Sequence, residues 1–236
     1  MTTTITEHQK NSPRDVSKNR KIEAKRVRDA TEVDNLLWRI RARTDISSQT
    51  GSIIGMTSCC RSSGVSTMVA NLAIRAAENH MGPVLIVDSN MSNPRQEKLF
   101  RQKSQAGTLD VLVGMVAPAE AIQRTSVPDL DLLTLGSKQQ LVTAKIVPKM
   151  FEELSLWARQ HYSTIFIDLP SIHELEHALM FARQADFTLV AIRSGSVRSQ
   201  DVVESINRLE EDGIKVAGTL LTRRKSFTPS WIRRFL

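Results

Sequence analysis

The segment from Thr57 to Thr67 has the composition and spacing of a loop that binds phosphate. It follows the apolar run Ile53–Met56 and leads into a segment whose apolar residues recur at helical spacing. In such a loop, backbone N–H groups and a helix N-terminus surround the anionic oxygens. The motif is G-x-x-x-x-G-K-[ST]. Here Cys59 stands at the first glycine, Gly64 at the second and Val65 at the lysine, so the backbone layout is present without its main charge.

Two carboxylates stand at the ends of apolar runs, because Asp88 closes Val84–Asp88 and Asp168 closes Thr164–Asp168. Ligands of parallel sheets bind at the carboxyl ends of the strands, so both side chains are expected beside the loop. Ser66, directly after the lysine position, is the expected hydroxyl ligand of Mg²⁺. We expect Asp168 to hold the metal through water, and Asp88 to hold the metal or to accept a proton from an attacking hydroxyl.

The elements that must position these residues alternate between strands and helices. Apolar runs predict strands over residues 53–56, 84–88, 130–135, 164–168, 187–192 and 216–221. Amphipathic spacing predicts helices over residues 32–43, from 66 onward, 144–161, 174–185 and 199–212, with helical or irregular structure over 95–105 and 108–116. This alternation predicts an α/β fold, with a mostly parallel twisted sheet covered by helices on both faces.

The length of 236 residues and the net charge of +7 favour one folded domain with basic ends. We expect a disordered tail over residues 1–30, a domain over 31–225 and a short basic amphipathic tail over 226–236. The basic ends are either solvated or suited to anionic membrane, whereas nucleic acid is disfavoured because no aromatic residues interleave the charges. The adjacent cysteines and the absence of a leader-like or membrane-length apolar run predict a cytoplasmic protein, with peripheral association at the inner face of the membrane as an alternative.

Six segments occur in an order that resembles the cytoplasmic kinase domain of bacterial tyrosine kinases for capsule and exopolysaccharide, a branch of the deviant P-loop ATPases related to MinD and ParA. They are TSCCRSSGVSTMVANLA, VLIVDSNMSNP, LDLLTLG, YSTIFIDLPS, ADFTLVAIRSG and VAGTLLTRR. The resemblance implies a three-layer P-loop ATPase fold that binds ATP or ADP with Mg²⁺ and forms homo-oligomers. Its implied partner is a membrane adaptor, or chain-length regulator, of polysaccharide export.

The resemblance also assigns site residues, and the sequence departs from it at several of them. The loop residues that it places against the phosphates are Cys60, Arg61, Ser62, Ser63, Gly64, Val65, Ser66 and Thr67. Thr222 stands where these ATPases commonly have an asparagine that contacts adenine. The family's Asp-x-Asp motif keeps Asp88 but has Asn90, and an oligomerisation pattern in the first helix survives only in part. The single tyrosine, Tyr162, is not in a C-terminal cluster.

These departures predict weak or absent catalysis, because losing one preorganised charge donor lowers a rate by about 10²–10³. The sequence therefore favours a degenerate tyrosine-kinase-like protein of capsular or exopolysaccharide biosynthesis or export, regulatory through a membrane adaptor or a homologous kinase. Two alternatives remain. The protein could be an active tyrosine kinase or ATPase in which Arg61 replaces the lysine and Asp88 and Asp168 are catalytic. It could instead be a MinD- or ParA-like positioning ATPase that binds membrane or DNA.

Two further patterns allow a functional and a structural interpretation. His173-Glu174-x-x-His177 matches the H-E-x-x-H zinc signature, with Glu174 as base, but no third ligand follows at a suitable spacing. The alternative is a polar helix entrance with exposed histidines. Cys59 and Cys60 could form a redox switch with a thiol pKa lowered by the helix N-terminus, or could be small residues that fill a tight loop.

Overall fold

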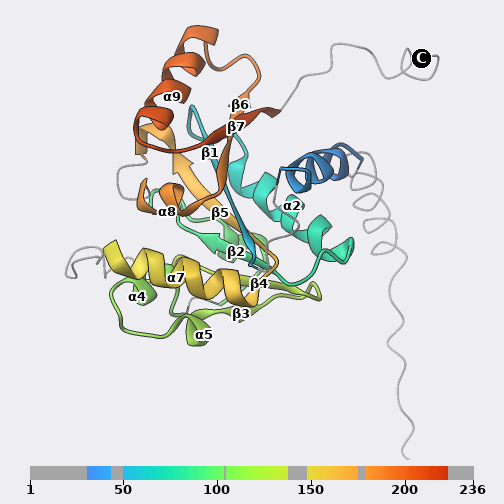
Figure 1. The fold of residues 1–236 in the computed structure, drawn as a ribbon, viewed down its shortest axis with the longest axis vertical. Helices are drawn as coiled ribbons and strands as arrows, with labels where there is room; N and C mark the ends of the chain where they lie inside the picture. Colours follow the sequence, from blue (N-terminus) through green and yellow to red (C-terminus); the bar gives the residue numbers. More distant parts are fainter. Residues whose placement is uncertain (1–30, 44–49, 104, 138–147, 175–178, 223–236) are drawn as a thin grey trace, which may run out of the picture.

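A computed structural model describes residues 31–43, 50–103, 105–137, 148–174 and 179–222 (Figure 1). Their strands form one seven-stranded sheet in the order β3-β4-β2-β5-β1-β6-β7. The strands are β1 Ser52–Ser58, β2 Val84–Asp88, β3 Gln123–Arg124, β4 Leu130–Leu133, β5 Thr164–Ser171, β6 Phe187–Arg193 and β7 Val216–Thr222. All pairs are parallel except β3 with β4, which is antiparallel. The carboxyl ends of β1, β2 and β5 therefore lie at one edge.

Helices cover both faces of this sheet (Figure 1). They are α2 Val65–Glu78, α3 Gln96–Leu99, α4 Thr108–Leu112, α5 Pro118–Ala121, α7 Pro148–His161, α8 Leu179–Gln184 and α9 Ser199–Glu211, together with a helix over residues 31–41 and a 3₁₀ turn, η1, at Ile172–Glu174. One apolar cluster joins the sheet to α2 and the helix at 31–41. The other joins it to α4, α5, α7, α8 and α9. The chain thus has a three-layer α/β architecture.

Both faces of the central strands are buried, which explains their continuous apolar sequences. All residues of β2 are buried. In β1, Ile53 packs in one cluster and its neighbour Ile54 in the other, because successive side chains of a strand point to opposite faces. A parallel sheet covered on both sides needs apolar residues at every position. This burial fixes the strand register and therefore where each strand ends.

The predicted fold class is confirmed, and β2 has the predicted bounds. The short α5 and β3 were not predicted, and the helix predicted over 174–185 is described as η1 and α8. The expected tails, 1–30 and 226–236, lie outside the described residues, so the limits of the folded domain stay predictions. Among the described residues, no helix combines the length and the apolar character needed to cross a bilayer.

Candidate functional site

The loop between β1 and α2, residues 59–64, turns the chain sharply into the helix, and we call it the Gly64 loop. Gly64 stands at the N-cap of α2 with φ 87° and ψ 17°, in the left-handed region. A Cβ added there would meet no atom within 4 Å, so the backbone conformation alone requires glycine. The predicted start of a helix after this glycine is confirmed, with Val65 as its first residue. The loop therefore has the backbone layout of an anion-binding turn.

Side chains of the strands and of the loop itself hold this turn in place. The Thr222 hydroxyl, at the end of β7, donates a hydrogen bond of 2.6 Å to the Ser63 carbonyl. Ser58 and Ser63 each donate from Oγ to the Cys60 carbonyl, at 2.8 and 2.7 Å. Thr57 donates to the Pro170 carbonyl at 2.6 Å. Thr222, predicted to contact adenine, thus has its hydroxyl directed to the loop backbone.

The Gly64 loop borders a hollow of about 440 Å³ at the carboxyl edge of the sheet. Its lining comes from the loop and the start of α2, from the segment after β2, and from the end of β5. These residues are Ser58, Arg61, Ser62, Ser63, Gly64, Val65, Ser66, Thr67, Asn90, Ser92, Asn93, Arg95, Leu99, Leu169, Ser171 and Glu174. The structure thus brings most of the predicted loop residues to one opening. Arg95 was not predicted, although it follows the polar loop after β2 directly.

The charges around the hollow differ from those of the consensus motif. Val65 is only 7% exposed and packs in the apolar cluster beneath α2. Arg61 forms an ion pair with Glu174, whose other oxygen accepts a 2.8 Å hydrogen bond from Ser171. Arg61 lowers the pKa of Glu174. No sequence pattern indicated this pairing, because Glu174 is far from Arg61 along the chain and stands in the H-E-x-x-H pattern.

Asp88 and Asp168, the acid pair, both stand in the carboxyl-terminal parts of their strands and lie opposite each other on the neighbouring strands β2 and β5, a pairing that was not predicted. Both side chains are fully buried and neither lines the hollow. Burial, and then the charge of Asp168, raises the pKa of Asp88, against three backbone N–H groups that lower it. Burial also raises the pKa of Asp168, while Ser66 and Gln96 lower it. The two acids share an environment that disfavours their double ionisation.

Gln96, at the start of α3, covers the acid pair and was not anticipated from the sequence. Its side-chain Nε2 donates to Asp168 Oδ2 at 2.8 Å and to the Ser66 carbonyl at 3.0 Å. Its backbone N–H donates to Asp88 Oδ2 at 3.1 Å. Gln96 is itself fully buried. A glutamine within a charged segment looks like an ordinary solvated residue, so no sequence signal marked it.

Of the predicted Mg²⁺ ligands, all of which have suitable chemistry, the two acids are not presented to a ligand in this fold. Magnesium requires near-octahedral oxygen ligands, several of them usually water. Ser66 lines the hollow, whereas the acid pair lies beneath it. Asp88 accepts backbone N–H groups on both oxygens, and within the described part of the chain Asp168 Oδ1 is the one acid-pair oxygen left without a hydrogen-bond partner. N–H donors engage three of the four acid-pair oxygens, so the acid pair as folded would have to rearrange to hold a magnesium ion.

The two other sequence patterns have structural explanations within the described residues. Glu174 contacts Arg61 and Ser171, and His177 lies outside the described residues. No group of three or more metal-binding side chains was found where the structure is described. Burial raises the pKa of the Cys59 thiol, opposite to the shift that a redox switch requires. The tight-loop interpretation of the cysteines is therefore favoured.

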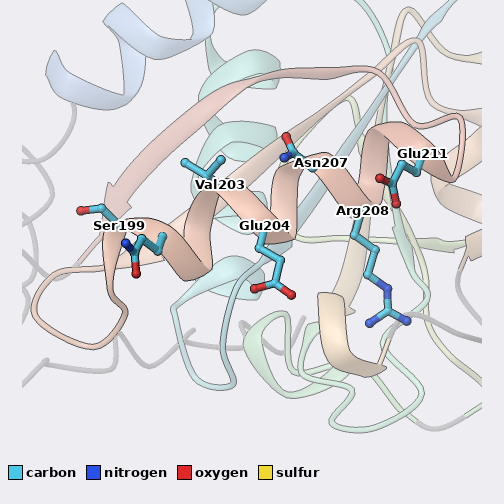
Figure 2. Close-up of a pocket in the computed structure, with 7 residues that line it drawn as sticks. Ser199, Val203, Glu204, Asn207, Arg208 and Glu211 are labelled. Carbon is cyan, nitrogen blue, oxygen red and sulfur yellow. The ribbon is translucent and has the colours of Figure 1, made fainter.

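A second hollow, of about 740 Å³, follows the outer face of α9 (Figure 2). Among described residues its lining comes from this one helix and includes Val203, Glu204 and Arg208. Figure 2 shows Val203 on one side of the helix and Glu204 and Arg208 on the other. None of the predicted site residues contributes to it. The hollow beside the Gly64 loop is therefore the candidate site.

No family model matches the chain. Individual curated proteins do: the chain is 27% identical over 170 residues to tyrosine-protein kinase wzc of Salmonella typhimurium, a match that covers 72% of this chain and 24% of that protein. It is also 27% identical over 172 residues to the putative tyrosine-protein kinase CapB of Staphylococcus aureus, covering 71% of this chain and 73% of the relative. The matched region thus spans about a quarter of the Salmonella kinase.

Solved structures show the same relationship. The chimerical protein CapA2B2 aligns with a TM-score of 0.64 at 25% identity, covering 77% of this chain and 79% of that one. MinD of Pyrococcus horikoshii, a septum site-determining protein solved with Mg-ADP, aligns with a TM-score of 0.64 at 20% identity, covering 79% and 77%. At that identity the likeness to MinD concerns the fold alone. The similar proteins are thus bacterial tyrosine-protein kinases, and the fold is that of P-loop ATPases.

Proposed function

We propose that this chain, which is a homologue of the bacterial tyrosine-protein kinases and has the P-loop ATPase fold, is a degenerate form of these kinases. It acts in capsular or exopolysaccharide biosynthesis or export by binding a membrane adaptor or a homologous kinase. It does not act by transferring phosphate. Any nucleotide in the hollow beside the Gly64 loop is bound without efficient turnover.

The observation that carries this proposal is the environment of Val65. This residue occupies the lysine position of the motif and is the first residue of α2. Its side chain is buried in the apolar cluster, where it supplies no hydrogen-bond donor to a phosphate. Removing one preorganised donor from such a site typically lowers the rate by about 10²–10³. Slow or absent phosphoryl transfer is the expected result.

The position of Tyr162 supports the same proposal. It is the only tyrosine of the sequence, and it lies just before β5, at the amino end of that strand. The candidate site lies at the opposite, carboxyl edge of the sheet. The Tyr162 hydroxyl is half-buried and donates to Asp131 Oδ2 at 2.9 Å. Tyr162 is therefore poorly placed as a phosphate acceptor.

Arg61 bears on the alternative of an active kinase. It lines the hollow, but its guanidinium is paired with Glu174 and must leave that carboxylate to contact a phosphate. The Arg61 side chain is 79% exposed, so the pair itself is weak. The decisive variant is therefore Arg61→Ala, which removes the proposed substitute for the lysine.

The positioning-ATPase alternative depends on the basic ends of the chain, which would bind membrane or DNA. These ends lie outside the described residues.

The test of the proposal is a phosphorylation assay with intact-mass and phosphotyrosine detection. The purified protein, incubated with ATP and Mg²⁺, is expected to gain no phosphate and to release little ADP. Added to a homologous active kinase domain, or to the cytoplasmic part of its membrane adaptor, it is expected to bind and to change the autophosphorylation rate. Robust autophosphorylation that Arg61→Ala abolishes would contradict the proposal and establish the active-kinase alternative.

The variant Val65→Lys tests whether the missing charge explains the defect. It returns an ammonium group to the start of α2, and ATP affinity is expected to rise by about tenfold because the phosphates regain a charged partner. Asn71→Lys adds the same charge at an exposed position of α2, more than one turn further along, and should leave ATP affinity unchanged. Equal effects of the two variants would show that only net charge matters.

A further inference from the structure

Gln96 links three parts of the candidate site, namely the two acids and the first turn of α2. Its side-chain amide contacts Asp168 and the backbone of Ser66, at 2.8 and 3.0 Å. Its backbone N–H contacts Asp88 at 3.1 Å. One fully buried residue thus holds both strands' acids and the first turn of α2 together. Each of these contacts places an N–H donor against an oxygen.

These contacts engage most of the oxygens of the acid pair. In the described part of the chain, the buried oxygens of this cluster that have no hydrogen-bond partner are Asp168 Oδ1 and the amide Oε1 of Gln96. Both oxygens of Asp88 accept backbone N–H groups, from Asn90 at 3.1 Å, Arg95 at 3.3 Å and Gln96 at 3.1 Å. One oxygen of Asp168 accepts the Gln96 amide. A divalent cation that approached the acid pair would also meet the hydrogens of this amide, which carry positive partial charge. Gln96 must therefore move away before a metal can reach Asp88 Oδ2 or Asp168 Oδ2.

The hollow above the acid pair has the opposite character. It is bordered by the N-terminus of α2 and by the cationic side chains of Arg61 and Arg95. Glu174 is the one carboxylate that the described residues contribute to its lining, and it is already paired with Arg61. Backbone N–H groups and guanidinium groups can both neutralise phosphate oxygens directly. An anion can thus bind here without a metal between it and the protein.

We propose that Gln96 takes the place of the metal in this chain, so that the hollow binds the phosphates of a nucleotide without Mg²⁺. The inference rests on the proposed function only for the location of the site. It adds which form of the ligand binds there: a free nucleoside diphosphate or triphosphate, not its magnesium complex. The absent catalysis then has a second cause beside Val65, because no ion is held where it would join the acid pair to the phosphates.

The experiment measures ADP binding by calorimetry in excess Mg²⁺ and in excess EDTA. For the wild type we expect the two dissociation constants to agree within about threefold. Gln96→Ala removes the amide from the acid pair, and its ADP affinity should become at least tenfold tighter with Mg²⁺ than with EDTA. Gln102→Ala is the matched control, because the Gln102 amide also donates to a backbone carbonyl, that of Arg124 at 3.0 Å, away from the acid pair. It should behave as the wild type.

Thermal unfolding with MgCl₂ alone gives a second measurement that needs no nucleotide. The wild type should show no shift in melting temperature, whereas Gln96→Ala should be stabilised by the ion. Wild-type ADP binding that weakens tenfold or more in EDTA would overturn the inference, even if Gln96→Ala failed to fold. No ADP binding in either buffer would also overturn it while leaving the proposed function intact, which fails instead if the protein phosphorylates itself.

Discussion

The Gly64 loop and the acid pair belong to the same edge of the sheet, yet one faces the hollow and the other is sealed beneath it. The loop directs backbone groups and exposed side chains to the opening. The acid pair is fully buried and engaged by N–H donors. A loop built from backbone conformation keeps its geometry when side chains change, provided that its glycine remains. A metal site built from side chains is lost when one neighbouring residue, here Gln96, places its amide N–H groups against the ligand oxygens.

The largest effect on this comparison is expected from Gly64→Ala. The left-handed φ of 87° disfavours any L side chain, at a stability loss of about 1–2 kcal/mol. Relaxing that strain would turn the N–H groups away from the hollow, so ADP binding should be lost. Chemical denaturation and calorimetry measure the two consequences separately.

Gly114→Ala provides the matched control for this substitution. Gly114 has φ 75° and open space around its Cβ position, but it lies after α4 and outside the lining of the hollow. It should lose similar stability and keep ADP binding. If both variants bound ADP equally, the Gly64 loop would not be the anion site.

Asp168→Asn tests the buried acid pair through the pH dependence of the free energy of unfolding. The pKa values of both acids are raised in the folded state, whereas an unfolded aspartate titrates near pH 4. The native state therefore binds more protons above about pH 4, and its stability falls as pH rises through the raised folded pKa values. The variant removes one charge, so its advantage over the wild type should grow with pH, by about 1.4 kcal/mol for every tenfold difference in proton affinity between the folded and unfolded states.

Urea unfolding at about pH 5 and about pH 8 measures this difference. Asp129→Asn is the control, because Asp129 is an exposed carboxylate whose left-handed φ of 58° asparagine tolerates. It should show no such pH dependence. A constant difference between Asp168→Asn and the wild type at both pH values would mean that the acid pair is not strained by charge.

Thr222→Val separates the loop from the strand that supports it. The substitution removes the 2.6 Å hydrogen bond to the Ser63 carbonyl while keeping the shape of the side chain. We expect a stability loss of about 1 kcal/mol, because a buried carbonyl is left without its donor. ADP affinity should fall several-fold as the loop gains freedom. Thr219→Val, an exposed position on β7, should change neither quantity. Unchanged ADP binding in Thr222→Val would show that the Thr222 hydroxyl neither supports the loop for binding nor contacts the nucleotide.

The sequence allowed the fold and the Gly64 loop to be predicted, but not the contacts that bury the acid pair. Buried strands such as Val84–Asp88 have continuous apolar residues, and the Gly64 loop has a glycine at a fixed spacing, so both leave local patterns. β3 has only two residues and leaves none. Gln96 meets Asp168 across 72 residues of sequence, and such a contact depends on tertiary packing alone. The role of Thr222 toward Ser63 was hidden for the same reason.

The smallest effect is expected at the amino ends of the strands, opposite the candidate site, where Tyr162→Phe removes one hydroxyl just before β5. Its 2.9 Å hydrogen bond to Asp131 Oδ2 is partly buried, so the loss should be about 0.5–1.5 kcal/mol of stability. The strands still end at the same positions, and ADP affinity at the carboxyl edge should therefore not change. A double-mutant cycle with Asp131→Ala measures the pair directly, since the two losses should not add. If Tyr162→Phe altered ADP binding, the two edges would be coupled, and the contrast between the Gly64 loop and the acid pair would no longer be local to the site.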